Sequence, residues 1–309
     1  MIVVLRPGFL TTLQDEGRWG YQRLGVQVAG PMDRVSHRLA NLIVENCLSC
    51  ATVEVTLRGP TLKFEHDTIF AVTGAEFELL LDSVSVPMNT AHVARSGSFL
   101  SFGERRCGAR SYIGVAGGVD VLPVLGSRST HVASQMGGVG GRALKTGDRL
   151  PVGRYGTRRE GPGQKWKALP KIAKEGAKVR VILGQNNGGL GLDGVAKLET
   201  SRYQVGRDSD RMGYRLAGPS LRETTAGNDI SSAVVTGAIQ VPPSGQPIIL
   251  MVDHQTTGGY PSIAHVITAD LPVVAQLAPS SWIEFEYCNR AAALKALIKQ
   301  ERGLMANRL

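Results

Sequence analysis

The sequence predicts a mainly β protein. Its 38 glycines interrupt short runs of apolar residues along the whole chain, and helical periodicity is confined to two segments. Short strands separated by turn signals are typical of a barrel or a sandwich and disfavour a repeated βαβ layout. Strands are expected at residues 2–5, 52–57, 61–64, 68–72, 77–81, 91–93, 99–102, 110–116, 248–252 and 263–267.

Two short helices are expected among these strands. The first covers residues 36–45, and Asp33 is its candidate N-cap because an aspartate side chain can accept a hydrogen bond from the first helical turn. The second covers residues 290–302. In each segment the apolar residues recur at helical spacing and form one stripe. The stripes consist of Val35, Leu39, Leu42 and Ile43 in the first helix, and of Ala293, Leu294, Leu297 and Ile298 in the second.

A basic segment divides the chain of 309 residues into two parts. Residues 154–177 hold seven basic and two acidic residues together with several glycines and prolines, a composition typical of a connector. We therefore expect an N-terminal β unit at residues 1–153, a linker at 154–177 and a C-terminal β unit at 178–309. A short, gapped repeat aligns Arg18 with Arg211 and Tyr21 with Tyr214, which predicts that the two β units are similar.

Composition and motif spacing disfavour several classes of function. More than half of the net charge of +9 lies in the linker, so a dedicated nucleic-acid surface is not expected. No run approaches the roughly 20 apolar residues of a membrane helix, and the first residues lack a signal-peptide pattern, so we expect a cytoplasmic protein that does not enter the membrane. Cys47 and Cys50 have C-x-x-C spacing without the second pair of ligands that a zinc site needs. We therefore predict no metal site.

The segment from residue 248 to residue 270 is the first candidate site. A buried apolar strand ends at Val252 and delivers Asp253 and further polar residues to its own end. The two glycines that follow, Gly258 and Gly259, can take backbone angles closed to other residues, which would leave their amide N–H groups free to converge on an anion or a carbonyl oxygen. The alternative is an ordinary tight hairpin, in which the aspartate and threonine side chains bond their own backbone.

The loop of residues 11–33 is the second candidate site. It is long, polar and rich in glycine, and long ordered loops are frequently functional. Arg18 offers a planar set of donors suited to a carboxylate or a phosphate, and Tyr21 and Gln22 add neutral hydrogen-bonding groups beside it. The alternative is that Arg18, with Asp15 nearby, only ties the loop to the rest of the fold.

Ten short motifs, in order along the chain, resemble those of the allophanate hydrolase subunit 2 family. They are Gln14-Asp-x-Gly-Arg18, Gly20-Tyr-Gln22, Gly30-Pro-Met-Asp33, Arg38-Leu-Ala-Asn-Leu42, Gly59-Pro60, Val115-Ala-Gly-Gly118, Leu125-Gly-Ser-Arg-Ser-Thr130, Ser209-Asp-Arg-Met-Gly-Tyr-Arg-Leu216, Gly237-Ala-Ile-Gln-Val-Pro-Pro243 and Gln255-Thr-Thr-Gly-Gly-Tyr-Pro261. The resemblance extends from Leu5 to about Phe285. Members of this family include the C subunit of 5-oxoprolinase, a bacterial antagonist of a kinase inhibitor, and part of the carboxyltransferase region of biotin-dependent urea carboxylase.

The resemblance implies a cyclophilin-like β-barrel architecture and a reaction that requires partners. In 5-oxoprolinase, such a chain works with an allophanate hydrolase subunit 1-type protein, which is the B subunit of that enzyme, and with its A subunit. The complex opens 5-oxoproline to glutamate at the expense of ATP. In the carboxyltransferase relatives, paired modules transfer a carboxyl group from carboxybiotin to urea or a similar amide. This chain lacks a Met-Lys-Met attachment site, so any biotin would arrive on another polypeptide. A third possibility is a regulatory protein that binds the subunit 1-type partner without doing chemistry.

Both reactions act on an amide carbonyl, which requires hydrogen-bonding groups where negative charge develops on oxygen. We predict that arginines hold an anionic group of a small amide or lactam substrate, that tyrosines shape the pocket, and that one of two aspartates is the general base. We further predict that the loops carrying Arg18, Arg211 and Thr257 meet around one crevice. The predicted catalytic residues are Asp253, Asp33, Arg211 and Tyr214, and the predicted substrate-binding residues are Arg18, Tyr21, Gln22, Arg215, Gln255, Thr256, Thr257, Gly258, Gly259 and Tyr260.

Overall fold

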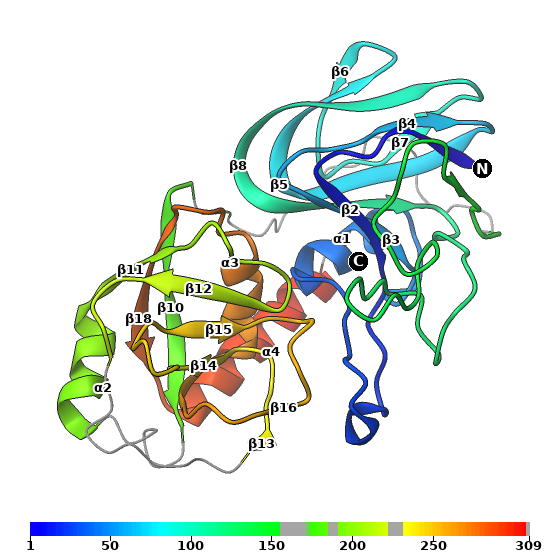
Figure 1. Cartoon of the computed structure of the whole chain (residues 1–309). Helices are drawn as coiled ribbons and strands as arrows, with labels where there is room; N and C mark the ends of the chain where they lie inside the picture. The colour runs from blue at the N-terminus through cyan, green and yellow to red at the C-terminus, as the bar shows by residue number, and fades with distance from the viewer. Residues whose placement is uncertain (155–171, 173, 185–190, 222–230, 307–309) are drawn as a thin grey trace. The chain divides into compact units, whose positions relative to one another are not determined.

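The computed structural model describes residues 1–154, 172, 174–184, 191–221 and 231–306. The chain divides into two compact units (Figure 1): unit 1 comprises Met1–Trp19, Ala29–Lys174 and Gly303–Leu309, and unit 2 comprises Gly20–Val28 and Glu175–Arg302. Most of the predicted linker lies outside the described residues, so the predicted domain boundaries stay a prediction. None of the described helices is both long and apolar enough to cross a bilayer.

Unit 1 is built on a nine-stranded sheet. Its strands are β1 (Ile2–Arg6), β2 (Leu10–Gln14), β3 (Thr52–Thr56), β4 (Thr61–Phe64), β5 (Thr68–Leu81), β6 (Val84–Val86), β7 (His92–Ala94), β8 (Phe99–Val115) and β9 (Arg149–Leu150). The main path runs β2-β3-β8-β4-β1-β9, and β5 pairs with β6, β7 and β8 beside it. Figure 1 shows the long strands β5 and β8 curving together across the unit.

The sequence-based prediction of separate strands at residues 68–72 and 77–81, and at 99–102 and 110–116, is wrong. Each pair is one continuous strand, β5 or β8. The register between them shifts on both sides of Glu76, and Gly74 has a left-handed φ of 88°. Such irregularities are β-bulges, which bend an antiparallel pair without ending it. In the sequence Gly74 resembles a turn between two strands, but in the structure it lies at a bend within the single strand β5.

The first predicted helix is confirmed as α1 (Arg34–Ile43), shifted by two residues towards the N-terminus. As predicted, Asp33 is its N-cap: the Asp33 side chain accepts a hydrogen bond of 2.9 Å from the backbone N–H of Ser36. The helix packs against β5 and β8. A Cβ atom on Gly114 of β8 would lie 2.7 Å from the carbonyl oxygen of Ala40, so the absence of a side chain there permits this close packing.

Unit 2 contains a closed barrel. Its strands are β10 (Gly176–Leu183), β11 (Arg202–Val205), β12 (Gly213–Ala217), β14 (Ala238–Gln240), β15 (Ile248–Leu250), β17 (Ser262–Val266) and β18 (Trp282–Tyr287). Their order around the barrel is β10-β17-β14-β15-β12-β11-β18. The pair β10 and β18 is parallel, and the other described neighbours are antiparallel. Alternation along β10 turns Val179 and Val181 into the barrel core, as the two-residue period of a strand requires.

The remaining elements of unit 2 are short, apart from the last helix. Two strands form a separate small sheet, β13 (Ser232–Ala233) with β16 (Thr257–Gly258). The helical elements are η1 (Gln22–Leu24), α2 (Gly191–Thr200), η3 (Thr268–Asp270), α3 (Leu271–Ala275) and α4 (Arg290–Met305), whose last three residues belong to unit 1. The second predicted helix is confirmed as α4, which extends beyond the predicted residue 302. The predicted fold class, mainly β with a few helices, is likewise confirmed.

Candidate functional site

Arg18 lies in the polar loop of unit 1 and is fully buried. Its Nε donates to the carbonyl oxygen of Val124 at 2.9 Å, and its Nη2 donates to the carbonyl oxygen of Ser129 at 2.8 Å. These bonds tie the loop after β2 to a second loop more than one hundred residues further along the chain. The contacts favour the alternative interpretation, in which Arg18 holds the loop in place.

Asp15 completes the same junction. Its Oδ1 accepts hydrogen bonds from the hydroxyls of Ser127 and Ser129, both at 2.6 Å, and its Oδ2 accepts one from the backbone N–H of Arg128 at 2.6 Å. Burial by itself would raise the pKa of Asp15, but these bonds and one from the N–H of Gly17 outweigh it and hold the pKa below its usual value. The carboxylate of Asp15 is therefore charged near neutral pH, and its hydrogen bonds hold the two loops together.

The other predicted site residues near this loop have different surroundings. Asp33 is buried, and its two carboxylate oxygens accept bonds from the backbone N–H and the hydroxyl of Ser36. Its own N–H donates to the phenol oxygen of Tyr112 at 2.7 Å. Tyr21 is half-buried and Gln22 is exposed in unit 2, where the Gln22 side chain accepts a bond from the N–H of Gly20. A base role for Asp33 stays a prediction, in which the proton would be taken up on a lone pair that Ser36 does not use.

Arg211 and Asp253 form a buried ion pair in unit 2, each only 5% exposed. The pair is bidentate: Nε of Arg211 lies 2.8 Å from Oδ2 of Asp253, and Nη2 lies 2.9 Å from Oδ1. The backbone N–H of Asp253 also donates to the carbonyl oxygen of Arg211. Planar pairing of this kind is strong and directional. The pair therefore fixes the segment that starts at Asp253 to the chain just before β12.

The segment after Asp253 presents polar groups at the surface of unit 2. Thr257, Gly259 and Tyr260 are exposed, while Gln255, Thr256 and Gly258 are partly buried. Gly258 lies in β16, opposite Ser232. Neither Gly258 nor Gly259 is among the residues with positive φ, so the prediction that they use backbone angles closed to other residues is wrong. Glycine suits position 258 because a Cβ atom would lie 3.0 Å from the Gln240 amide nitrogen.

Tyr214 and Arg215 are neighbours on β12 and face opposite sides. Tyr214 is buried in the barrel, and its hydroxyl donates to the carbonyl oxygen of Ala275 at 3.4 Å. Arg215 points outward, and its side chain is 59% exposed. This alternation is the two-residue period of a strand. Of these two predicted site residues, Arg215 is the one whose side chain solvent and a ligand can reach.

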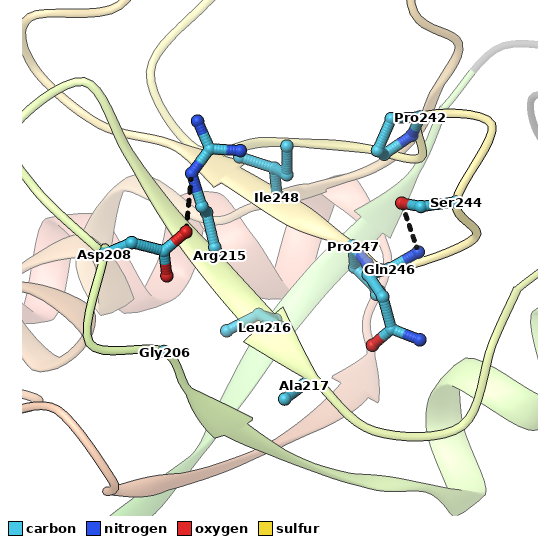
Figure 2. Close-up of a pocket in the computed structure, with 10 residues that line it drawn as sticks. All are labelled: Gly206, Asp208, Arg215, Leu216, Ala217, Pro242, Ser244, Gln246, Pro247 and Ile248. Carbon is cyan, nitrogen blue, oxygen red and sulfur yellow. Dashed lines mark hydrogen bonds and ion pairs between the residues drawn. The ribbon is translucent and has the colours of Figure 1, made fainter.

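Arg215 borders a hollow of about 360 Å³ on unit 2. Figure 2 shows Arg215 and Asp208 on one side of β12, and Pro242, Ser244, Gln246 and Pro247 on the other side. Nε of Arg215 lies 3.1 Å from Oδ2 of Asp208. The hollow is lined by Gly206, Asp208, Arg215, Leu216, Ala217, Pro242, Ser244, Gln246, Pro247 and Ile248.

The structure brings together only part of the predicted set. Arg211, Asp253 and the segment through Tyr260 share one region of unit 2, while Arg18 belongs to unit 1, so the common crevice stays a prediction. Arg215 lies in β12, whereas Arg211 lies two residues before that strand begins. The sequence did not predict that Asp208 and the turn from Pro242 to Pro247 line a hollow beside Arg215. Pro242 nevertheless lies in one of the family motifs, and Asp208 directly precedes another.

The described residues contain no group of three or more His, Cys, Asp or Glu side chains placed to hold a metal ion. The lining of the hollow includes one arginine and no lysine. A triphosphate requires several basic groups or backbone N–H donors around its oxygens. The hollow therefore does not fit the phosphates of ATP.

These features belong to a carboxyltransferase-type domain. Residues 24–287 match the family described as "Carboxyltransferase domain, subdomain A and B", and the chain belongs to this family. It is 40% identical to the C subunit of 5-oxoprolinase from Escherichia coli (strain K12) over 302 residues, which is 98% of this chain and 96% of that protein. The crystal structure of the K. lactis urea amidolyase superposes with a TM-score of 0.93 and 31% identity over 99% of this chain, which corresponds to 20% of that chain. The predicted family resemblance is confirmed.

Proposed function

We propose that this protein is the C-type component of an ATP-dependent 5-oxoprolinase, which converts 5-oxoproline to L-glutamate together with a B-type and an A-type partner. The observation that carries the proposal is the similarity to the C subunit of 5-oxoprolinase along nearly the whole of both chains. A similarity limited to the barrel would support only a shared fold. In this proposal the protein lacks a complete active site on its own.

The surface of unit 2 supplies the groups that this reaction needs. Ring opening places negative charge on the lactam carbonyl oxygen, which hydrogen-bond donors stabilise. The hydroxyls of Thr256 and Thr257 and the amide of Gly259 are the proposed donors, and Tyr260 is exposed beside them. The buried pair of Arg211 and Asp253 would hold this segment in position. Both oxygens of Asp253 accept bonds from Arg211, so in its predicted base role Asp253 would take up a proton on a lone pair that Arg211 does not use.

Reconstitution of the complex tests the proposal. Wild-type chain with its two partners is expected to form glutamate from 5-oxoproline only when ATP is present. We expect Arg211→Ala to lower kcat by about a hundredfold, because a misplaced catalytic segment typically costs that much. Arg202→Ala is the matched control, since Arg202 forms an exposed ion pair with Glu284 on the same barrel and should leave turnover unchanged. Unchanged turnover in Arg211→Ala would remove this pair from the mechanism.

A carboxyltransferase module is the second candidate, favoured by the family match and by the similarity to urea amidolyase. It would require biotin on another polypeptide. Urea-dependent or amide-dependent loss of the carboxyl group from carboxybiotin, presented on a partner, would support this candidate over the first. Binding of the B-type partner without turnover in either assay would favour a regulatory role.

A further inference from the structure

The hollow beside Arg215 has the lining of a binding site for a small dipolar ligand. We infer that it binds a lactam that carries a carboxylate, the chemical class of 5-oxoproline. This inference rests on the proposed function, because the proposed reaction supplies that substrate class. It goes beyond the proposed function in assigning a first binding site for the substrate to residues outside the threonine-glycine segment, where the substrate is held before it reaches that segment.

The first wall of the hollow is the turn before β12. The backbone N–H of Gly206 donates to the carbonyl oxygen of Arg215 at 2.8 Å, and the hydroxyl of Ser209 accepts a bond from the N–H of Arg215 at 3.1 Å. The turn itself closes by a bond from the N–H of Ser209 to the carbonyl oxygen of Gly206. Asp208 and Arg215 are therefore held on a fixed frame before any ligand arrives.

The second wall is the turn from Pro242 to Pro247. It closes by a bond of 2.8 Å from the N–H of Gly245 to the carbonyl oxygen of Pro242. The side-chain amide of Gln246 bonds both the N–H and the carbonyl oxygen of Gly218, at 3.0 and 3.2 Å. The N–H of Leu216 donates to the carbonyl oxygen of Pro247 at 2.9 Å. Both walls are thus tied to β12, and a preformed hollow loses little entropy when it binds a ligand.

The charged groups at the rim determine the class of ligand. Arg215 and Asp208 are 59% and 68% exposed, so their ion pair is solvated and weak, and a ligand can separate them at small cost. A carboxylate would bond the guanidinium of Arg215, and an N–H group would bond the carboxylate of Asp208. A simple anion is disfavoured by Asp208, and a simple cation is disfavoured by Arg215. A ligand that carries a carboxylate and an N–H donor satisfies both groups.

The rest of the lining favours a ring over an open chain. Ala217, Pro242, Pro247 and Ile248 offer apolar surface, on which the methylene groups of a lactam can pack. Free glutamate would instead bring a second carboxylate into a hollow whose lining holds one basic side chain, that of Arg215. The volume of about 360 Å³ lies at the low end of the range for small-molecule sites, which suits a single small ring.

Binding to the full chain tests the inference by ligand-observed NMR with 5-oxoproline. We expect wild type to bind 5-oxoproline, and to bind 2-pyrrolidone, which lacks the carboxylate, about tenfold more weakly. Arg215→Ala should weaken binding of 5-oxoproline by about tenfold, the usual effect of losing a hydrogen bond to a charged group. Arg207→Ala is the matched control, because Arg207 is exposed on the same turn and does not line the hollow.

The same variants in the reconstituted complex separate this inference from the proposed function. The inference predicts a raised KM for 5-oxoproline in Arg215→Ala and a normal KM in Arg207→Ala. An active complex whose KM does not change in Arg215→Ala overturns the assignment of the hollow and leaves the proposed function intact. Binding that depends on Arg215, in a complex that does not turn over 5-oxoproline, overturns the proposed function and leaves the site intact. Wild-type chain that does not bind 5-oxoproline also overturns the inference.

Discussion

Arg18 is a buried arginine whose donors bond the protein's own backbone and not a ligand. The fork of donors that suits a carboxylate also suits two backbone carbonyl oxygens, and the structure supplies those of Val124 and Ser129. Sequence reasoning left both interpretations open because the acceptors lie more than one hundred residues away along the chain. The pairing of Arg211 with Asp253 was equally out of reach, since the residues are separated by 42 positions and nothing local couples them.

Replacement of Arg18 tests the architectural role. Arg18→Met keeps much of the side-chain volume but removes the donors, so the buried carbonyl oxygen of Ser129 and the partly buried one of Val124 lose these bonds. We expect the free energy of unfolding to fall by about 3 kcal/mol. Urea unfolding followed by circular dichroism measures this change. Arg23→Met is the control, because Arg23 is exposed in the same loop and should change stability by less than about 0.5 kcal/mol. Unchanged stability with weakened substrate binding would restore the predicted ligand role of Arg18.

At the level of elements, local signals predicted eight of the eighteen described strands and the two helices α1 and α4. The cap at Asp33 and the stripe of α1 depend only on neighbouring residues, so the sequence was sufficient for them. The continuity of β5 and β8 was not predictable in this way, because a glycine at a bulge and a glycine at a turn look alike until the partner strand is known. The second wall of the hollow was also not predictable, because the turn from Pro242 to Pro247 is distant from β12 in the sequence and only the folded structure brings the two together.

The bulge at Gly74 gives a prediction about the pairing of β5 and β8. Gly74 has φ of 88°, and a Cβ atom there would clash with the carbonyl oxygen of Arg110 on β8. Gly97 has a similar φ of 91°, but nothing lies within 4 Å of its Cβ position. Gly97→Ala should therefore cost about 1 to 2 kcal/mol from backbone strain alone, and Gly74→Ala should cost clearly more because the strands must also move apart. Chemical unfolding of the two variants compares these costs. Equal losses would show that backbone strain alone requires glycine at the bulge.

For the whole molecule, the buried imidazole of His37 and the carboxylates of Asp15 and Glu16 link stability to pH. Burial lowers the pKa of His37 to about 4, although the charges of Glu16 and Asp15 act in the opposite direction. The His37 ring lies between the hydroxyl of Thr52, 2.9 Å from Nδ1, and the carbonyl oxygen of Leu48, 3.2 Å from Nε2. In the folded protein His37 is therefore neutral near neutral pH, and protonation favours the unfolded chain, in which its pKa is about 6.5.

The carboxylates act in a lower pH range. Burial would raise the pKa of Glu16, but its bonds with Arg38 and Arg34 outweigh burial and lower it. Asp15 shows the same balance with its serine and backbone donors. A carboxyl group whose folded pKa lies below its unfolded value stabilises the fold above the unfolded value, and this contribution is lost as pH falls through the folded pKa. For these two groups the loss begins near about pH 4, the usual pKa of a carboxyl group.

Because His37 and the two carboxylates act in different pH ranges, we expect acid to destabilise the protein in two stages. Between about pH 6.5 and about pH 4, protonation of His37 in the unfolded chain should remove roughly 3 kcal/mol of stability, at about 1.4 kcal/mol per pH unit. Below about pH 4 the carboxylates should add a second loss. Urea midpoints measured across this range resolve both stages. His37→Gln should start at lower stability but lose most of the first stage, whereas His66→Gln, at an exposed position of the same unit, should keep it. If His37→Gln retained the full loss between about pH 6.5 and about pH 4, the first stage would belong to other groups, because no protonation of position 37 could then contribute.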